Sequence, residues 1–268
     1  MNQKLTKYAW LLPFFSCICW GAAGIFVRTL EHDGLDNFSI ISFRMLLAAL
    51  ITGIWILVFY NISVTKGSLA LSAVLLAMSP VFVLFLAAIF FHEPITRHKL
   101  ICVTLALIGC VLVSGVLESN GLSWSITGIL CGILASFFYA VYGIISKKVT
   151  QKGYHFLTIT FYGTLFSGMT MLPFSNIHSL SSMIVSGQRT TFFILIIHAL
   201  VSSVLPYALY SLSMRYMEAG KASILASSEP AAAMLFGAVL YAETPGILSI
   251  CGLCFTITAV ILLNYERN

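Results

Sequence analysis

The chain has 268 residues, of which 59% are hydrophobic and only 9% are charged, and its mean hydropathy is +0.99. An average soluble domain has roughly 25% charged residues, so this composition excludes a water-soluble globule. Because a helical crossing needs about 20 apolar residues, the length holds nine or ten spans and excludes an additional catalytic domain outside the membrane.

The formal net charge of +5 does not indicate nucleic-acid binding. The 14 Lys and Arg residues are spread along the chain, and the densest cluster is only Lys147, Lys148 and Lys152. The seven cysteines lie mostly within apolar runs and do not resemble a secreted disulfide framework. Cys251 and Cys254 have redox-motif spacing, but small residues inside a span are typical of helix packing. We therefore expect no nucleic-acid partner, cofactor or metal site.

Nine apolar runs predict membrane-spanning helices. The first run follows Lys4 and Lys7 as a signal peptide would, but it continues through Trp20 and Phe26 without a small-residue cleavage site. We interpret it as a retained helix. In chain order the predicted spans cover residues 8–28, 38–60, 69–91, 100–117, 125–146, 154–174, 192–214, 222–242 and 246–264. The sequence thus predicts an all-α membrane protein.

An internal duplication divides the chain into two repeats, residues 1–118 and 119–268. Residues 59–114 align without a gap on residues 209–264, at an offset of 150. The duplication predicts that both repeats have the same helices.

The front parts of the repeats align at a different offset. Trp20 aligns on Tyr139 at an offset of 119, and Phe43 aligns on Phe161 at an offset of 118. Because the offset then rises to 150, the first repeat lacks about 32 residues that the second has. That is about the length of one span, so five spans are predicted in the second repeat and four in the first.

The distribution of Lys and Arg tests this missing span, because these residues in short loops favour the cytoplasmic side. With ten spans and a cytoplasmic N-terminus, only Arg28, Lys66 and Arg189 fall outside; with nine spans, nine basic residues do. The ten-span arrangement is favoured. Either a segment is missing from this sequence, or the protein is a shortened variant whose first half inserts abnormally. The ten residues predicted inside are Lys4, Lys7, Arg97, Lys99, Lys147, Lys148, Lys152, Arg215, Lys221 and Arg267.

An odd number of spans in each repeat gives the two repeats opposite orientations across the membrane. Secondary transporters have such inverted repeats, and their substrate sites lie near the middle of the membrane between the repeats. The predicted fold is therefore an inverted repeat of five-helix units, of which the first lacks about one helix.

Several short motifs recur in order along nearly the whole chain. They are Cys19-Trp20-Gly21 through Arg28, Phe43-Arg44, Ser79-Pro80 and Glu93-Pro94-Ile95-Thr96 in the first half, then Ser228-Glu229-Pro230 and Ala242-Glu243-Thr244. Their order, spacing and duplication resemble the EamA-like branch of the drug/metabolite transporter superfamily. The resemblance implies ten helices in two inverted five-helix repeats, cytoplasmic termini, and export of amino acids or other small metabolites.

Two charged residues lie within apolar spans, where ionisable groups are costly and often functional. Arg44 is a candidate for binding a substrate carboxylate or gating the extracellular side; alternatively it snorkels to the interface or bonds helix carbonyls. Glu229 precedes Pro230, which can break the helix. Its carboxylate is a candidate for binding a substrate amine or carrying a proton, or it caps freed backbone groups. Ser79 is the equivalent position in the first repeat and lacks the charge.

Polar aromatic residues complete the candidate site. His198 is either a proton relay or a histidine satisfied by a neighbouring hydroxyl. Tyrosines three residues apart share one helix face, where they line a moderately polar cavity or only pack. The predicted substrate-binding residues are Trp20, Arg44, Ser79, Tyr139, Tyr142, Tyr162, His198, Tyr207, Tyr210 and Glu229.

The leading hypothesis is a secondary transporter of the cytoplasmic membrane that exports amino acids or related amphiphilic compounds by alternating access. The sequence has no nucleophile–base set, phosphate-binding loop or metal-ligand pair, so we expect no enzyme. Alternatives are an uptake permease of the same fold, an intramembrane lipid enzyme and a transport-inactive shortened variant. The expected partners are a small-molecule substrate and the lipid bilayer, and the protein is a monomer or a homodimer.

Overall fold

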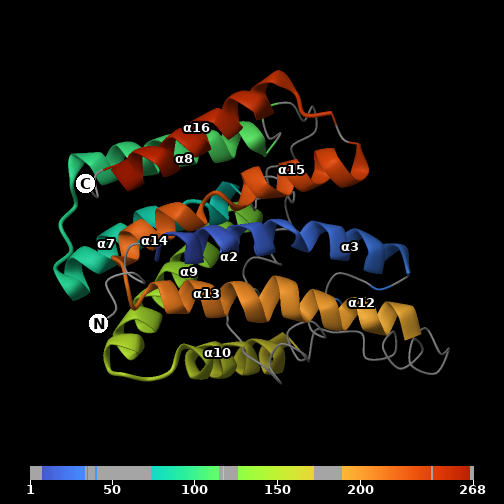
Figure 1. Ribbon diagram of the computed structural model, residues 1–268, viewed down its shortest axis with the longest axis horizontal. Coiled ribbons are helices and arrows are strands. Elements are labelled where there is room, and N and C mark those ends of the chain that lie inside the picture. The colour runs from blue at the N-terminus through green and yellow to red at the C-terminus, as the bar shows by residue number, and fades with distance from the viewer. Residues whose placement is uncertain are drawn as a thin grey trace.

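The computed structural model describes residues 8–33, 35, 40, 74–114, 117, 126–171, 189–242 and 244–265, and these residues form helices and no strands. The long helices lie beside one another in an elongated bundle, crossed by α9 (Figure 1). In chain order the elements are α2 (Leu11–Gly21), α3 (Ala23–His32), α7 (Ser79–Phe91), α8 (Arg97–Val113), α9 (Ile126–Gln151), α10 (Phe156–Met171), α12 (Arg189–Ala199), the π-helical turn η2 (Leu200–Val204), α13 (Leu205–Ser213), α14 (Ala219–Ala226), α15 (Glu229–Tyr241) and α16 (Ile247–Tyr265).

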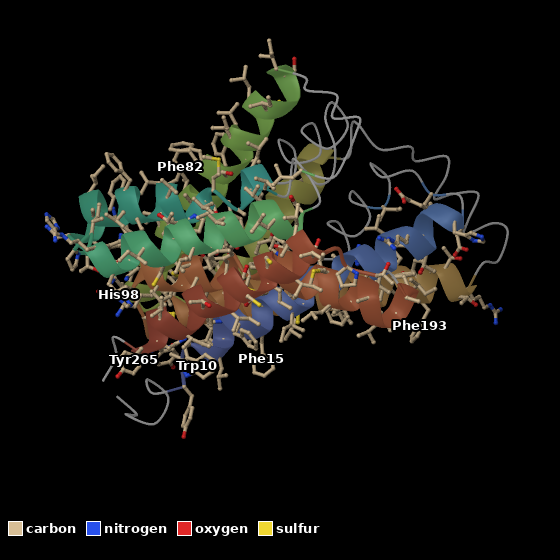
Figure 2. The ribbon with its side chains drawn as sticks, turned by 90° about the horizontal axis from the view of Figure 1, so that it is seen from above. Trp10, Phe15, Phe82, His98, Phe193 and Tyr265 are labelled. Carbon is tan, nitrogen blue, oxygen red and sulfur yellow. The ribbon has the colours of Figure 1, made fainter. Side chains whose placement is uncertain are left out.

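The outer surface of the bundle is apolar. Phe15, Phe193 and Tyr265 are at least half exposed, and Figure 2 shows them at the periphery of the ribbon. Such a surface is unfavourable in water and matches lipid hydrocarbon. Six stretches among the described residues are long and apolar enough to cross a membrane: Leu11–His32, Val74–Phe91, Ile126–Gln151, Arg189–Ser213, Ala219–Tyr241 and Ile247–Tyr265. The protein is therefore a multi-pass membrane protein.

Helices occupy eight of the nine apolar runs that the sequence predicts. The remaining run, 38–60, lies outside the described residues apart from Ile40. The all-α prediction is thus confirmed for the described part of the chain, and the number of spans, nine or ten, stays a prediction.

Contacts between helices establish their directions. α8 and α16 are antiparallel, because His98 Nε2 lies 2.9 Å from the Leu262 carbonyl oxygen while Gly109 packs against Gly252. α7 and α9 run in the same direction, because the chain just before α7 meets the first half of α9 and the chain just after α7 meets its last turns.

Most basic residues gather at one end of the bundle, which we call the basic end. α8 begins there, and α9 and α13 end there. Trp10 and Asn264 line one pocket with Glu218, so the first and last described helices also meet this end. The opposite end has Arg28 in the second half of α3 and Arg189 at the start of α12. The basic residues at the basic end are Arg97, Lys99, Lys147, Lys148, Lys152, Arg215 and Lys221.

Four of the described spans are interrupted. The break predicted at Pro230 is confirmed, because α14 ends at Ala226 and α15 begins at Glu229. The other interruptions lie at Ala22, at residues 77–78 before α7, and at the π-helical turn η2 before Pro206. Breaks of this kind free backbone carbonyls within the protein interior, where side chains must satisfy them.

Side chains of neighbouring helices bond these freed carbonyls. The Cys17 thiol on α2 donates to the Leu225 carbonyl oxygen at 3.1 Å, and the Ser136 hydroxyl on α9 donates to the carbonyl of Leu75. These two breaks are therefore bonded to neighbouring helices inside the core.

Candidate functional site

Five of the predicted site residues form one buried aromatic cluster in the largest core region: Trp20, Tyr139, Tyr142, Tyr207 and Tyr210. The ring centroid of Trp20 lies 5.1 Å from that of Tyr207 and 5.9 Å from those of Tyr139 and Tyr210. Tyr142 lies 5.8 Å from Tyr207 and 6.3 Å from Tyr210. These separations favour edge-to-face and stacked aromatic pairs. The cluster joins α2, α9 and α13.

Helix periodicity explains why these rings converge. Tyr139 and Tyr142 share one face of α9, and Tyr207 and Tyr210 share one face of α13, because residues three apart are neighbours on a helix surface. Trp20 lies at the end of α2, next to the interruption at Ala22. In this conformation the rings pack directly on one another, and none of the five residues is more than 8% exposed.

Buried hydroxyl groups continue from the cluster toward the basic end. The Tyr142 hydroxyl lies 2.6 Å from the Ser211 hydroxyl. The hydroxyls of Tyr210, Ser146 and Ser223 are also buried; Tyr210 lies beside Ser223, and Ser146 lies beside Tyr142. These neighbouring hydroxyls provide buried polar groups that a ligand can bond.

Glu229 borders the aromatic cluster. It opens α15 and is half-buried, and it lies near Tyr139 on α9 and near Cys17 and Cys110 on α2 and α8. An acidic residue in the first turn is also favoured by the helix dipole. Ser79, the equivalent residue of the first repeat, is buried at the start of α7. Glu229 therefore places a carboxyl group beside the rings.

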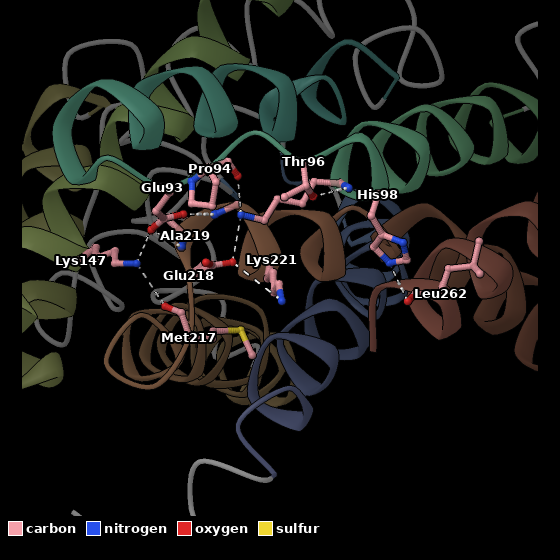
Figure 3. Close-up of polar contacts among 12 residues, drawn as sticks. Glu93, Pro94, Thr96, His98, Lys147, Met217, Glu218, Ala219, Lys221 and Leu262 are labelled. Carbon is pink, nitrogen blue, oxygen red and sulfur yellow. Dashed lines mark hydrogen bonds and ion pairs between the residues drawn. The ribbon is translucent and has the colours of Figure 1, made fainter. Parts of the chain in front are cut away.

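A second polar group lies at the basic end, where Glu93 and Lys147 form a buried ion pair (Figure 3). The Glu93 carboxylate also accepts hydrogen bonds from the backbone N–H of Ala219 at 3.1 Å and of Gly220 at 3.4 Å. The Lys147 ammonium donates to the Met217 carbonyl oxygen at 3.3 Å. One ion pair thus connects the end of α7, the end of α9 and the start of α14 with Met217 before it.

Further charges extend this network. The Lys99 ammonium donates to the Pro94 carbonyl oxygen at 2.9 Å and pairs with the Glu218 carboxylate at 3.0 Å. Lys221 lies 3.9 Å from the same carboxylate. Lys99 is almost fully buried, so its charge is balanced inside the protein.

Local backbone geometry places Glu93 in this network. α7 ends at Phe91, and His92 adopts the left-handed conformation with φ 55°. The Glu93 N–H then bonds back to the Ala87 carbonyl oxygen at 3.3 Å, as in a helix C-terminal capping turn. This turn directs Glu93 toward the start of α14.

Comparison with known proteins identifies the family. The family model for the EamA-like transporter family matches residues 52–115 and 126–265. The chain belongs to this family. It is therefore a membrane transporter and not an enzyme, and the resemblance drawn from the sequence motifs is confirmed.

Individual relatives agree with this assignment. The chain is 22% identical to "Uncharacterized transporter YxxF" of Bacillus subtilis, over 100% of this chain and 93% of the relative. It is 24% identical to an "Uncharacterized transporter" of Archaeoglobus fulgidus, over 97% of each chain. A solved crystal structure shares the fold with a TM-score of 0.77 over 96% of both chains, at 11% identity.

The other predicted residues of this EamA-like transporter lie in different surroundings. His198 is fully buried; its ring stacks on Phe26 at 5.1 Å, and Nδ1 lies 3.1 Å from the Ser202 hydroxyl. A neighbouring hydroxyl thus lies within hydrogen-bond distance of His198, and whether the residue relays protons stays a prediction. Tyr162 is 55% exposed on α10, so it is not part of the buried cluster. α10 is rotated about its axis so that Tyr162 faces away from the core. Arg44 lies outside the described residues.

Glu93 and Lys147 were not predicted as site residues. Glu93 stood out only as part of a motif, and Lys147 only as a topology charge. The sequence feature that could have pointed to Glu93 and Lys147 is that both lie at span ends on the side predicted to be cytoplasmic. No spacing rule pairs residues this far apart in sequence. Within the ranges that the structure describes, no three His, Cys, Asp or Glu residues group as a metal site.

Proposed function

We propose that this EamA-like transporter exports small amphiphilic metabolites, such as amino acids, across the cytoplasmic membrane by alternating access, and that the aromatic cluster with Glu229 binds the substrate. The carrying observation is that Trp20 and four tyrosines, predicted from separate helices, converge beside interrupted spans. Discontinuous helices near the middle of the membrane are where secondary transporters bind substrates.

The chemistry of the cluster suits an amphiphilic amine. Aromatic faces attract cations and cover apolar groups, and the Glu229 carboxylate complements a positive charge. The buried hydroxyls of Tyr210, Ser146 and Ser223 offer hydrogen bonds to a polar group. Because the rings are packed together in this conformation, substrate entry requires the helices that carry them to separate.

Recurring contacts support two inverted repeats, residues 1–118 and 119–268. α7 and α15 begin and end 150 residues apart, and both are followed by a non-glycine residue with positive φ, His92 and Ala242. Cys17 bonds the carbonyl of Leu225, and Ser136 bonds the carbonyl of Leu75. Ser136 lies 119 residues after Cys17, and Leu75 lies 150 residues before Leu225, so the two bonds are equivalent under the repeat offsets. α7 runs toward the basic end, whereas α15 runs away from it.

The charge distribution supports a cytoplasmic location for the basic end, since Lys and Arg in short loops favour that side. All seven basic residues described there belong to the ten predicted inside, and Arg28 and Arg189 at the opposite end belong to the three predicted outside.

Counterflow in proteoliposomes tests the proposal. Vesicles loaded with unlabelled amino acids and small amines should take up the labelled compounds with saturable kinetics, and Trp20→Ala should reduce the rate about tenfold or more, the equivalent of about 1.4 kcal/mol. Phe15→Ala is the matched control, because Phe15 is an aromatic residue on the same helix that is half exposed. Efflux from loaded cells distinguishes export from uptake.

Two outcomes contradict the proposal. One is the absence of saturable flux with every pool for the unmodified chain, which is the expectation for a transport-inactive variant. The other is equal loss in Trp20→Ala and Phe15→Ala. The role of Glu229 is tested separately, since Glu229→Gln should change the pH dependence of flux if the carboxylate exchanges a proton.

A further inference from the structure

The Glu93–Lys147 ion pair closes the basic end between the helices that carry the candidate site. The side chains of Glu93 and Lys147 are only 8% and 9% exposed. The pair joins α7 to α9, and its remaining hydrogen bonds reach Met217 before α14 and Ala219 and Gly220 at the start of α14. Three parts of the bundle are therefore held at one point.

The groups directly behind this ion pair are the buried hydroxyls of Ser146, Ser223 and Tyr210. Ser146 is the neighbour of Lys147 on α9, and Ser223 lies one turn beyond Gly220 on α14. The Tyr210 hydroxyl approaches the same part of α9, since a Cβ on Gly143 would lie 3.2 Å from it. From the basic end toward the centre of the bundle, the order is therefore the ion pair, then the buried hydroxyls, then the aromatic cluster. If the basic end opens, this ion pair must separate first.

The position of the pair also suits repeated opening. Removing charges from water is expensive, and the attraction between buried charges roughly offsets that cost. At the basic end of the bundle both groups can regain water when they separate, because neighbouring Lys148 on α9 is already exposed. The net free energy of separation is therefore smaller than the attraction alone suggests.

A related contact lies at the opposite end. The Lys147 ammonium lies 5.3 Å from the centroid of the Phe91 ring, and the Arg28 guanidinium lies 4.6 Å from that of Tyr241. The two pairs occupy equivalent positions in the repeats, because Lys147 corresponds to Arg28 at the offset of 119 and Phe91 corresponds to Tyr241 at the offset of 150. The equivalent of Glu93 is Glu243, which lies outside the described residues. The duplication thus provides each end with one cation held against one ring.

We propose that the Glu93–Lys147 ion pair is the gate of the basic end, and that the contact of Arg28 with Tyr241 performs the matching role at the opposite end. The ion pair holds the hydroxyl groups and the aromatic cluster away from water on the basic side. Its separation opens that side, while the opposite contact stays formed. This inference rests on the proposed transport function.

Thiol accessibility tests the gate without any substrate. In a chain whose seven native cysteines are replaced, Ser223→Cys places a reporter just behind the ion pair, where Ser223 is 1% exposed. A membrane-impermeant methanethiosulfonate reagent is added to vesicles of known orientation, from either side. Glu93→Gln combined with Lys147→Met removes both charges, so no buried charge is left unpaired. The reporter should then react about tenfold faster from the basic side, as expected when the equilibrium shifts by about 1.4 kcal/mol.

Three further variants keep the result interpretable. Lys148→Met removes an exposed lysine one position away and should leave the reporter rate unchanged. Lys147→Arg keeps the cation and should stay within about threefold of the unmodified pair. If the neutral pair does not fold, Glu93→Asp decides the question, since it retains the charge but shortens the reach. It should raise the rate from the basic side only.

The gate is overturned if the neutral pair reacts no faster than Lys148→Met, because the ion pair then serves stability alone. Equal acceleration from both sides also overturns it, since that result indicates general loosening. Thermal unfolding of each variant in the same vesicles separates loosening from gating. Because labelling needs no transported substrate, a failed gate test leaves the transport proposal standing, and failed counterflow with intact gating contradicts only that proposal.

Discussion

The two ends of the bundle are held together by different interactions. At the basic end, Glu93 and Lys147 are buried and satisfied by backbone groups. At the opposite end, Arg28 lies over the partly exposed Tyr241 ring, and the Thr191 hydroxyl donates to the Asp33 carboxylate at 2.7 Å. Buried charges depend on their partners, whereas exposed contacts contribute little individually. The basic end should therefore be sensitive to single substitutions and the opposite end tolerant of them.

The largest effect is expected for Lys147→Met. The substitution leaves the Glu93 carboxylate buried without its cation, and breaking a buried pair in this way costs about 3–5 kcal/mol of unfolding free energy. Denaturant titration in mixed micelles measures the change. Adding Glu93→Gln should restore most of the loss, while Lys148→Met should stay within about 0.5 kcal/mol of the parent. A single variant as stable as the double would contradict the sensitivity of the basic end.

The second prediction compares Gly21, which is tightly packed, with Gly24, which lies nearer the opposite end and has open space beside it. A Cβ on Gly21 would lie 2.8 Å from the Ala232 Cβ and from the Ala233 backbone nitrogen, so Gly21→Ala should destabilise the protein by about 1–3 kcal/mol. A Cβ on Gly24, three residues further along, would have nothing within 4 Å. Gly24→Ala should therefore be neutral or stabilising by up to about 1 kcal/mol, because alanine favours helix. The same titration checks both, and equal losses would refute the difference.

The third prediction concerns the hydrogen bond between Thr191 and Asp33. Thr191→Val keeps the shape but removes the donor, so we expect a loss of about 1 kcal/mol. The effect should be local, which amide hydrogen exchange at the end of α3 can measure. Thr190→Val is the control, because Thr190 is the exposed neighbour on α12. Faster exchange throughout the bundle would argue against a weak, local contact.

The smallest effect is expected at Tyr241. Tyr241→Leu removes the ring beneath Arg28, and an exposed cation–π contact contributes about 0.5–1 kcal/mol. Tyr241→Phe retains the ring and loses only the hydrogen bond to the Ile25 carbonyl oxygen, which measures 3.2 Å. Phenylalanine should therefore be closer to the parent than leucine in thermal unfolding. The reverse order would assign the stabilisation to the hydroxyl group.

Much of the fold follows from local rules that a single sequence reveals. Apolar runs of sufficient length predict spans, and Pro230 lacks the N–H that a continuous helix needs, so the break between α14 and α15 could be predicted. Tyr139 and Tyr142, like Tyr207 and Tyr210, share a face because helix periodicity places them there. Tyr162 illustrates the limit, since its repeat position gave no information about which way α10 faces.

The sequence by itself determined that this is a helical membrane protein with aromatic residues within its spans, because hydropathy and periodicity act over a few helical turns. Only the tertiary structure decided that Glu93 pairs with Lys147 and that Trp20 meets the tyrosines of two other helices. Such contacts depend on how distant helices cross and rotate. Many weak packing terms set those angles jointly, and no short stretch of sequence contains them.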